Sequence, residues 1–211
     1  MKRTIILVDD HSIVRAGFKQ LLEGTGKFLV VAEAKDGHEG YSLYLKHKPD
    51  IIILDIAMEG VSGLDVLERI LKKDRSAKVV MLSMFEDYAF VSRAINLGAY
   101  GYISKSIEPE KLFFAMGEIA SGKRWIDADI ALEMALNKIS GEGTFTDILT
   151  PREFEVFCSL ARGKSVSEIA ESMIISEKTV GTHRTKVMDK LRINNLAELT
   201  RLAIRHQIIT P

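Results

Sequence analysis

The run Ile51-Ile52-Ile53-Leu54-Asp55 constrains the fold of this chain more than any other stretch. It is apolar, rich in β-branched residues and too short for a helix, so it predicts a buried parallel strand. In doubly wound sheets ligands bind just beyond the carboxyl ends of strands, and Asp55 stands at such an end. A second run, from Thr4 to Val8, ends in Asp9 and Asp10. If these strands are neighbours, their carboxylates share one pocket, and the repulsion between them requires a hard cation.

Strand and helix patterns alternate along the N-terminal part of the chain. Apolar runs predict strands at 4–8, 28–31, 51–55, 78–82 and 100–103, and helical spacing of apolar residues predicts helices at 11–23, 36–46, 64–72, 88–97 and 109–120. Asp36, with Glu39 three residues later, has the pattern of a capping box. Regular alternation of this kind favours a parallel sheet with helices on both faces.

Polar residues stand at the ends of most of these strands. Besides the aspartates, Ser83 follows the fourth strand, and Lys105 comes just after the fifth. Any one of them has an ordinary explanation, because polar residues begin where buried strands end. Together they supply what a phosphoryl group needs: carboxylates for a cation, a nucleophilic acid, a hydroxyl and a positive charge.

Residues 1–122 resemble the receiver domain of two-component response regulators. The resemblance rests on Asp9, Asp10, Asp55, Gly63, Ser83, Tyr102 and Lys105, which agree in order and spacing. It implies an α/β flavodoxin-like (CheY-like) domain with a five-stranded, doubly wound sheet. It also implies that Asp55 takes a phosphoryl group from a phosphohistidine of a sensor histidine kinase.

The same resemblance implies a role for each residue of the pocket. Mg²⁺ would be bound by Asp10, Asp55 and the backbone carbonyl of Ala57, with Asp9 assisting through water. The phosphoryl oxygens would be held by Ser83 and Lys105, and Tyr102 would move inward in response.

Several positions depart from the family pattern. Glu59 stands where a proline is frequent, so the loop after Met58 lacks a rigid turn residue. Ser106 stands where the family often has a proline preceded by a cis peptide bond. Because a cis bond before a residue other than proline costs about 2.5–4 kcal/mol, the isomer of the Lys105-Ser106 bond is left open. Ala57 and Phe85, at positions linked to the hydrolytic water, have no polar side chain. We therefore expect slow self-dephosphorylation.

The pattern changes after Gly122. Residues 123–145 are expected to form a linker, with one helix over 127–139 and a Gly- and Ser-containing stretch after it. Trp125, the only tryptophan, is expected to pack at an interface under that helix rather than to stack on a ligand. Residues 146–211 would then form a second domain.

This second domain shows helix signals and no strand pattern. Helix starts are marked by Thr150-Pro151 with Glu153, Ser165 with Glu168, Ser176, and Asn195 with Glu198. The short segment 173–176 joins the second and third helices, as in a helix-turn-helix pair. An all-α domain of four helices is predicted.

Positive charge gathers on the third of these helices. The chain has 29 bases and 29 acids, so no overall field attracts nucleic acid. Residues 178–192, however, contain five bases and one acid, a local net charge of +4. Helical spacing turns Val180 and Val187 inward and Thr182 and Thr185 outward among the bases. A solvated face is the ordinary alternative, but the second helix of a helix-turn-helix is the one that enters the major groove.

Residues 146–209 resemble the LuxR-type output domain of NarL/FixJ response regulators. The matching segments are 149–153, 161–163, 168–170, 176–180, His183 and Lys190-Leu191. The resemblance implies a recognition helix over about 177–190, with DNA contacts from Lys178, Thr179, Thr182, Arg184, Thr185, Lys186 and Lys190. It also implies a dimer contact through Leu199, Leu202 and Ala203. Gly181 stands where the family often has lysine.

The two halves together predict a DNA-binding response regulator that phosphorylation switches. Expected partners are a sensor histidine kinase, double-stranded promoter DNA with an inverted repeat, and a second copy of the chain after phosphorylation or on DNA. Cys158 is the only cysteine and no apolar run is long enough to span a membrane, so we expect a cytoplasmic protein. Beyond Mg²⁺-dependent self-phosphorylation and slow dephosphorylation, no enzyme activity is expected.

Three other classes of protein share parts of this pattern. Phosphatases and phosphotransferases with an aspartyl-phosphate use an acid two residues after the nucleophile, where this chain has Ala57. A dinucleotide-binding enzyme needs a Gly-rich turn after the first strand, where this chain has Asp9-Asp10-His11. A receiver whose helical domain binds protein or RNA stays open, and salt-dependent binding to duplex DNA would separate it.

Overall fold

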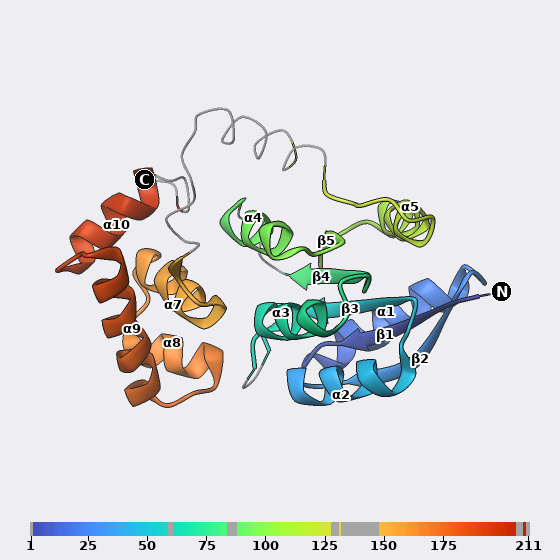
Figure 1. Cartoon of the computed structure of the whole chain (residues 1–211), viewed down its shortest axis with the longest axis horizontal. Coiled ribbons are helices and arrows are strands. Elements are labelled where there is room, and N and C mark those ends of the chain that lie inside the picture. The colour runs from blue at the N-terminus through green and yellow to red at the C-terminus, as the bar shows by residue number, and fades with distance from the viewer. Residues whose placement is uncertain are drawn as a thin grey trace. The chain divides into compact units, whose positions relative to one another are not determined.

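A computed structural model of the chain describes residues 2–58, 61–83, 88–127, 131, 148–205 and 209. The chain forms two units, an N-terminal α/β unit and a C-terminal helical unit (Figure 1). No helix among these residues is both long enough and apolar enough to cross a membrane.

The α/β unit is built on a five-stranded parallel sheet. Its strands are β1 (Arg3–Val8), β2 (Phe28–Ala34), β3 (Ile51–Asp55), β4 (Val79–Ser83) and β5 (Gly101–Ser104), in the order β2-β1-β3-β4-β5. The order confirms the predicted flavodoxin-like fold. Because the chain proceeds from β1 to opposite sides of the sheet, the crevice for a ligand lies beyond the ends of β1 and β3.

Helices cover both faces of this sheet. They are α1 (Ser12–Gly24), α2 (Gly37–His47), α3 (Gly63–Lys73), α4 (Tyr88–Leu97) and α5 (Pro109–Ala120). On one face α1 and α5 pack Leu22 and Met116 against Ile5 and Ile53. On the other face α2 approaches β1 so closely that a Cβ on Gly40 would lie 2.7 Å from Val8 Cγ1. The sheet is therefore buried on both sides, as its continuous apolar strands predict.

Two local predictions in this unit differ from the structure. The second strand was predicted to end at residue 31, but β2 continues to Ala34, because its pairing with β1 outweighs the low strand propensity of the last residues. Asp36 caps α2 as predicted, since its carboxylate accepts a hydrogen bond from Glu39 N at 2.9 Å. The Glu39 carboxylate, however, accepts from Lys35 N rather than from Asp36 N, so the predicted reciprocal box is displaced by one residue.

Trp125 packs on the α/β unit. Its carbonyl accepts a hydrogen bond from Tyr102 N and its amide donates to Tyr100 O, each at 3.1 Å, which continues the sheet beyond β5. Its ring meets Phe114 of α5 edge-on, with 5.5 Å between centroids. The predicted helix at 127–139 and the stretch after it lie almost entirely outside the described residues, so the interface role of Trp125 stays a prediction.

The C-terminal unit contains α7 (Pro151–Ala161), α8 (Val166–Met173), α9 (Glu177–Leu191) and α10 (Leu196–Arg205). Complete capping boxes at Thr150 and Ser165 begin α7 and α8, as predicted. The hydroxyl of Ser176 accepts a hydrogen bond from Thr179 N at 3.1 Å and begins α9. A short turn joins α8 to α9, which confirms the helix-turn-helix pair.

Candidate functional site

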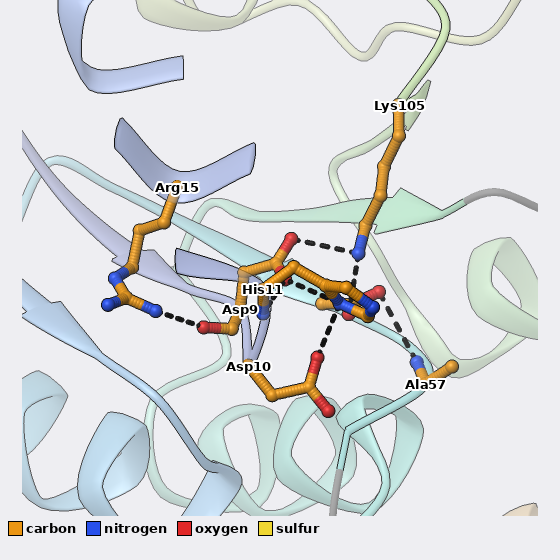
Figure 2. A network of polar contacts seen from close by, with 7 residues as sticks. Asp9, Asp10, His11, Arg15, Ala57 and Lys105 are labelled. Atoms are coloured by element: carbon orange, nitrogen blue, oxygen red, sulfur yellow. Dashed lines mark hydrogen bonds and ion pairs between the residues drawn. The ribbon is translucent and has the colours of Figure 1, made fainter. Parts of the chain in front are cut away.

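An acidic pocket lies at the carboxyl ends of β1 and β3. Ligand atoms of Asp9, Asp10, His11 and Asp55 all lie within 4.8 Å of one another. Figure 2 shows Asp9, Asp10 and His11 converging, with Lys105, which follows β5, reaching toward them. The prediction that two neighbouring strand ends gather the aspartates is confirmed.

Lys105 is held inside this pocket. Its Nζ lies 2.9 Å from Asp9 Oδ2 and 2.7 Å from Asp55 Oδ2, and its side chain is 4% exposed. Its backbone amide donates a hydrogen bond to Ser83 O at 2.8 Å, which fixes the end of β5 beside the end of β4. The sequence predicted both residues at one edge of the sheet, and the structure brings them together.

Burial and charge shift the protonation of this pair. Burial raises the pKa of Asp55 to about 7, and the neighbouring carboxylate of Asp9 adds to the rise, while Lys105 opposes it. Burial lowers the pKa of Lys105, but the carboxylates of Asp55 and Asp9 outweigh it, so this pKa is raised. The folded pocket therefore favours the charged form of Lys105 and disfavours the charged form of Asp55.

The donor set fits a hard divalent cation. Asp9 and Asp55 are each 1% exposed, and with Asp10 they bring three carboxylates to face the single positive charge of Lys105. Buried carboxylates with excess negative charge are the oxygen ligands that Mg²⁺ and related ions take in proteins. The sequence-predicted ligands are thus present in one place.

The loop after β3 folds back over the strand end. The amide of Ala57 donates a hydrogen bond to Asp55 Oδ1 at 3.3 Å, and the amide of Gly63 donates to Ile56 O at 3.0 Å. A Cβ at Gly63 would lie 2.0 Å from the carbonyl oxygen of Asp55, so only glycine fits there. Glu59 and Phe85, singled out in the sequence, lie outside the described residues.

Sequence reasoning missed two residues of the pocket. His11 Nδ1 lies 2.7 Å from Asp10 Oδ1, and the His11 amide donates to Asp9 Oδ1 at 2.8 Å. Arg15, one turn further along α1, donates from Nη1 to the carbonyl of Asp9 at 2.6 Å. Their closeness in sequence to the acidic pair was the available signal.

Two further predicted residues are buried near these strand ends. Ser83 is 1% exposed and ends β4. Tyr102 was expected to move inward on phosphorylation, and in this conformation it is already only 4% exposed. The described residues contain no cis peptide bond, so the bond before Ser106 is trans.

The α9 helix presents most of the predicted DNA-contacting side chains to solvent. Lys178, Thr179, Thr182, Thr185, Lys186 and Lys190 are exposed and Arg184 is half-buried, whereas Val180 and Val187 are buried. The hydroxyls of Thr182 and Thr185 donate to the carbonyls of Lys178 and Gly181, at 3.0 and 3.1 Å. Each hydroxyl proton is thus used within the helix, leaving oxygen lone pairs and a methyl group on its surface.

Two sequence assignments in this unit fall on residues that also make contacts inside the unit. Lys190 was assigned to DNA; its Nζ lies 2.6 Å from Glu153 Oε2 of the α7 capping box, and its contact with DNA stays a prediction. Leu199 and Ala203 were assigned to a dimer contact, which stays a prediction; both are 0% exposed on α10, which packs against α7. Their helical spacing marks an apolar face, and that face is covered by the domain's own core. Of the three, Leu202 alone keeps partial exposure.

Comparisons with known families agree with both units. The family described as "Response regulator receiver domain" matches residues 5–116, and that described as "Bacterial regulatory proteins, luxR family" matches residues 147–203. The chain belongs to the two-component response regulators with a LuxR-type helix-turn-helix domain.

Full-length relatives share this organisation. The response regulator UvrY of Escherichia coli strain K12 is 35% identical over 204 residues, which cover 96% of this response regulator and 94% of UvrY. The oxygen regulatory protein NreC of Staphylococcus epidermidis is 32% identical over 214 residues, covering 97% and 98% of the two chains.

Solved structures give the same result. A LuxR-family two-component response regulator from Aurantimonas sp. SI85-9A1 is 37% identical, with a TM-score of 0.62 over 66% of this chain and 99% of that one. RcsB from Salmonella enterica serovar Typhimurium, bound to promoter rprA with the phosphomimetic BeF3-, is 26% identical. Its TM-score is 0.63 over 95% of this response regulator and 98% of RcsB.

Proposed function

We propose that Asp55 accepts a phosphoryl group from a phosphohistidine of a sensor kinase and that this controls DNA binding by the helix-turn-helix. The observation that carries the proposal is the buried Asp55 carboxylate, 2.7 Å from Lys105 Nζ, in a pocket with two further carboxylates. In this proposal residues 1–122 form the receiver, 123–145 the linker and 146–211 the DNA-binding domain.

The reaction is a displacement at phosphorus. A carboxylate oxygen of Asp55 forms the new P–O bond as the P–N bond to the imidazole breaks, and the imidazole leaves with the bonding electrons and takes a proton. Lys105 and the hydroxyl of Ser83 receive the phosphoryl oxygens at the neighbouring strand ends. Because these groups belong to the receiver, it can also use a small phosphoryl donor without the kinase.

A divalent cation, Mg²⁺, completes the proposed site. Asp10, Asp55 and the carbonyl of Ala57 would hold it, with Asp9 assisting through water. When bound, it neutralises the charge that develops on the phosphoryl oxygens. Ala57 offers no polar side chain to position a hydrolytic water, which supports slow self-dephosphorylation.

Phosphorylation with a small donor tests the acceptor. Acetyl phosphate and Mg²⁺ should add one phosphoryl mass to the wild type and none to Asp55→Asn, as read by intact mass. Equal labelling of both would remove the assignment. Asp10→Ala should weaken Mg²⁺ binding strongly, and unchanged affinity would contradict the cation ligands.

We propose that α9 enters the major groove of DNA. The chain would bind as a homodimer to an inverted repeat, with the centres of the two half-sites about 10 bp apart. Exposed Lys178 and Lys186 and half-buried Arg184 suit phosphates. Thr182 and Thr185, whose hydroxyl protons are bonded within the helix, offer methyl groups and acceptor oxygens to base edges. RcsB, a structural relative, is bound to promoter DNA in its solved complex.

Phosphorylation would act by shifting the equilibrium between an inactive and an active conformation. A change in the ratio of the two conformations from 1:99 to 99:1 would require about 5.5 kcal/mol, so a partial shift is expected.

Selection of binding sites from a random duplex library tests these roles. Thr182→Ala or Thr185→Ala should change the preferred base, at about 1–3 kcal/mol for each mismatched position. Lys186→Ala should keep the consensus while weakening binding to all sequences. If both threonine variants keep the wild-type consensus and the lysine variant changes it, the assignment of base contacts to the threonines and phosphate contacts to the lysine is wrong. If the protein shows no salt-dependent binding to duplex DNA, a protein or RNA partner is favoured instead.

A further inference from the structure

We propose that His11 is a nitrogen ligand of the cation pocket and that it adapts the pocket to first-row divalent metals such as Mn²⁺. The inference rests on the proposed cation site and adds a fourth donor to it. It also states which class of metal that donor favours.

The position of His11 is unusual for the residue that precedes a helix. His11 is the N-cap of α1, where Ser, Thr, Asp or Asn normally uses its side chain to cap the helix. The His11 side chain makes no such bond. Its ring instead turns over the acidic pocket, as Figure 2 shows.

Backbone hydrogen bonds hold His11 beside the pocket. The His11 amide donates a hydrogen bond to Asp9 Oδ1 at 2.8 Å, which fixes the backbone beside the pocket. Arg15 N donates to the His11 carbonyl at 3.0 Å, and the Arg15 guanidinium also binds the Asp9 carbonyl. The imidazole is thus attached to the same short segment as the carboxylates, while its side chain, 64% exposed, remains free to adjust.

The donor spacing suits one ion. Nδ1 lies 2.7 Å from Asp10 Oδ1 and 3.3 Å from Asp9 Oδ1. Adjacent ligands of an octahedral ion bound at about 2.1 Å are about 3.0 Å apart, midway between these two distances. A small movement of the ring would let one cation replace the contact between His11 Nδ1 and Asp10 Oδ1, with Asp9 still assisting through water.

The chemistry of imidazole then sets the preference. Mg²⁺ prefers oxygen ligands, whereas imidazole suits first-row transition metals, whose affinity rises from Mn²⁺ through Co²⁺ to Ni²⁺. A pocket of three carboxylates and one imidazole should therefore bind Mn²⁺ and Co²⁺ more strongly, relative to Mg²⁺, than the carboxylates alone would.

The direct test is pulsed electron paramagnetic resonance of Mn²⁺ bound to the full-length protein. A ¹⁴N modulation from a coordinated imidazole is expected in the wild type and in the control His38→Gln, which removes an exposed histidine of α2. It should be absent in His11→Gln. Titrations should show Co²⁺ affinity falling by at least about tenfold in His11→Gln, with Mg²⁺ affinity falling much less.

Each other outcome would overturn the inference. If Mn²⁺ binds, and Asp10→Ala weakens it, but the wild type shows no ¹⁴N modulation, His11 only hydrogen-bonds the carboxylates. Modulation that persists in His11→Gln would identify another nitrogen. If the wild type binds neither Mn²⁺ nor Mg²⁺, the proposed cation site itself fails with it. Circular dichroism of His11→Gln, a change at an exposed side chain, verifies that the variant is folded.

Discussion

Lys190 Nζ lies 2.6 Å from Oε2 of Glu153, so the end of the recognition helix α9 is tied to the capping box that begins α7. The Glu153 side chain is 4% exposed. Burial raises its pKa, but hydrogen bonds from Lys190 and Thr150 outweigh burial, and the pKa is lowered overall. One carboxylate therefore caps a helix and also binds a residue 37 positions away.

Lys190→Ala and Lys186→Ala should separate stability from DNA binding. Lys190→Ala leaves the buried Glu153 carboxylate without its positively charged partner and should lower the free energy of unfolding by about 1–3 kcal/mol. Lys186→Ala, at an exposed site, should change it by no more than about 0.5 kcal/mol but reduce the salt slope of DNA binding by about one unit. Urea unfolding and binding at several salt concentrations give both quantities. A full unit of salt slope lost in Lys190→Ala, with stability unchanged, would support its predicted phosphate contact instead.

Asp55→Asn should stabilise the cation-free protein at alkaline pH. Because the folded protein raises the pKa of Asp55 to about 7, the folded state holds this proton more tightly than the unfolded state does. Wild-type stability should therefore fall as the pH rises from about 4 to about 7, and asparagine removes that loss. The free energy of unfolding of Asp55→Asn at pH 8 should exceed that of the wild type by at most about 4 kcal/mol. The gain is smaller than this limit because Lys105 loses its ion pair with Asp55 in the variant.

Unfolding curves in a chelator at pH 5 and pH 8 check this expectation. The difference between Asp55→Asn and the wild type should grow with pH. A control, Asp65→Asn, changes an acid in the first turn of α3 that does not belong to the acidic pocket and should show no such growth. Equal stability differences at both pH values would show that Asp55 is not held in a raised-pKa environment.

Replacement by alanine should be favourable at Gly181 and unfavourable at Gly63. Nothing lies within 4 Å of a Cβ at Gly181, so Gly181→Ala should stabilise α9 by about 0.5–1 kcal/mol. A Cβ at Gly63 would lie 2.0 Å from the Asp55 carbonyl oxygen, so Gly63→Ala must displace the loop after β3 and should weaken Mg²⁺ binding. Thermal unfolding and Mg²⁺ titration of both variants measure these effects. Unchanged Mg²⁺ affinity in Gly63→Ala would mean that the loop does not shape the cation site.

Ile174 should gain stability on replacement by asparagine. This residue ends α8 with φ 50° and ψ 51°, a left-handed conformation that a β-branched side chain disfavours, and its side chain is 54% exposed. Ile174→Asn should raise the free energy of unfolding by about 1 kcal/mol, since asparagine accepts this conformation and little apolar contact is lost. Leu196→Asn, a similar polar change at an exposed position of α10, should give no gain. Equal effects in the two variants would show that backbone conformation is not the cause.

The sequence by itself determined the elements and the chemistry of the strand ends. Capping residues such as Thr150 and Ser165 accept hydrogen bonds from backbone amides three residues away. Because this effect is local, the sequence alone predicts it. Apolar runs that are buried on both faces of a sheet leave polar residues only at their ends, which placed Asp9 and Asp55 correctly. The order of these local signals was sufficient to predict the sheet and the helix-turn-helix.

Only the tertiary structure decided which side chain meets which. Lys105 reaches a carboxylate 50 residues earlier, and Lys190 reaches one 37 residues earlier, because the fold brings their elements together. The apolar spacing of Leu199 and Ala203 could not tell a dimer surface from the domain's own core. A periodic pattern shows that a face must be covered but not what covers it, since burial and charge pairing depend on the three-dimensional neighbours that packing supplies.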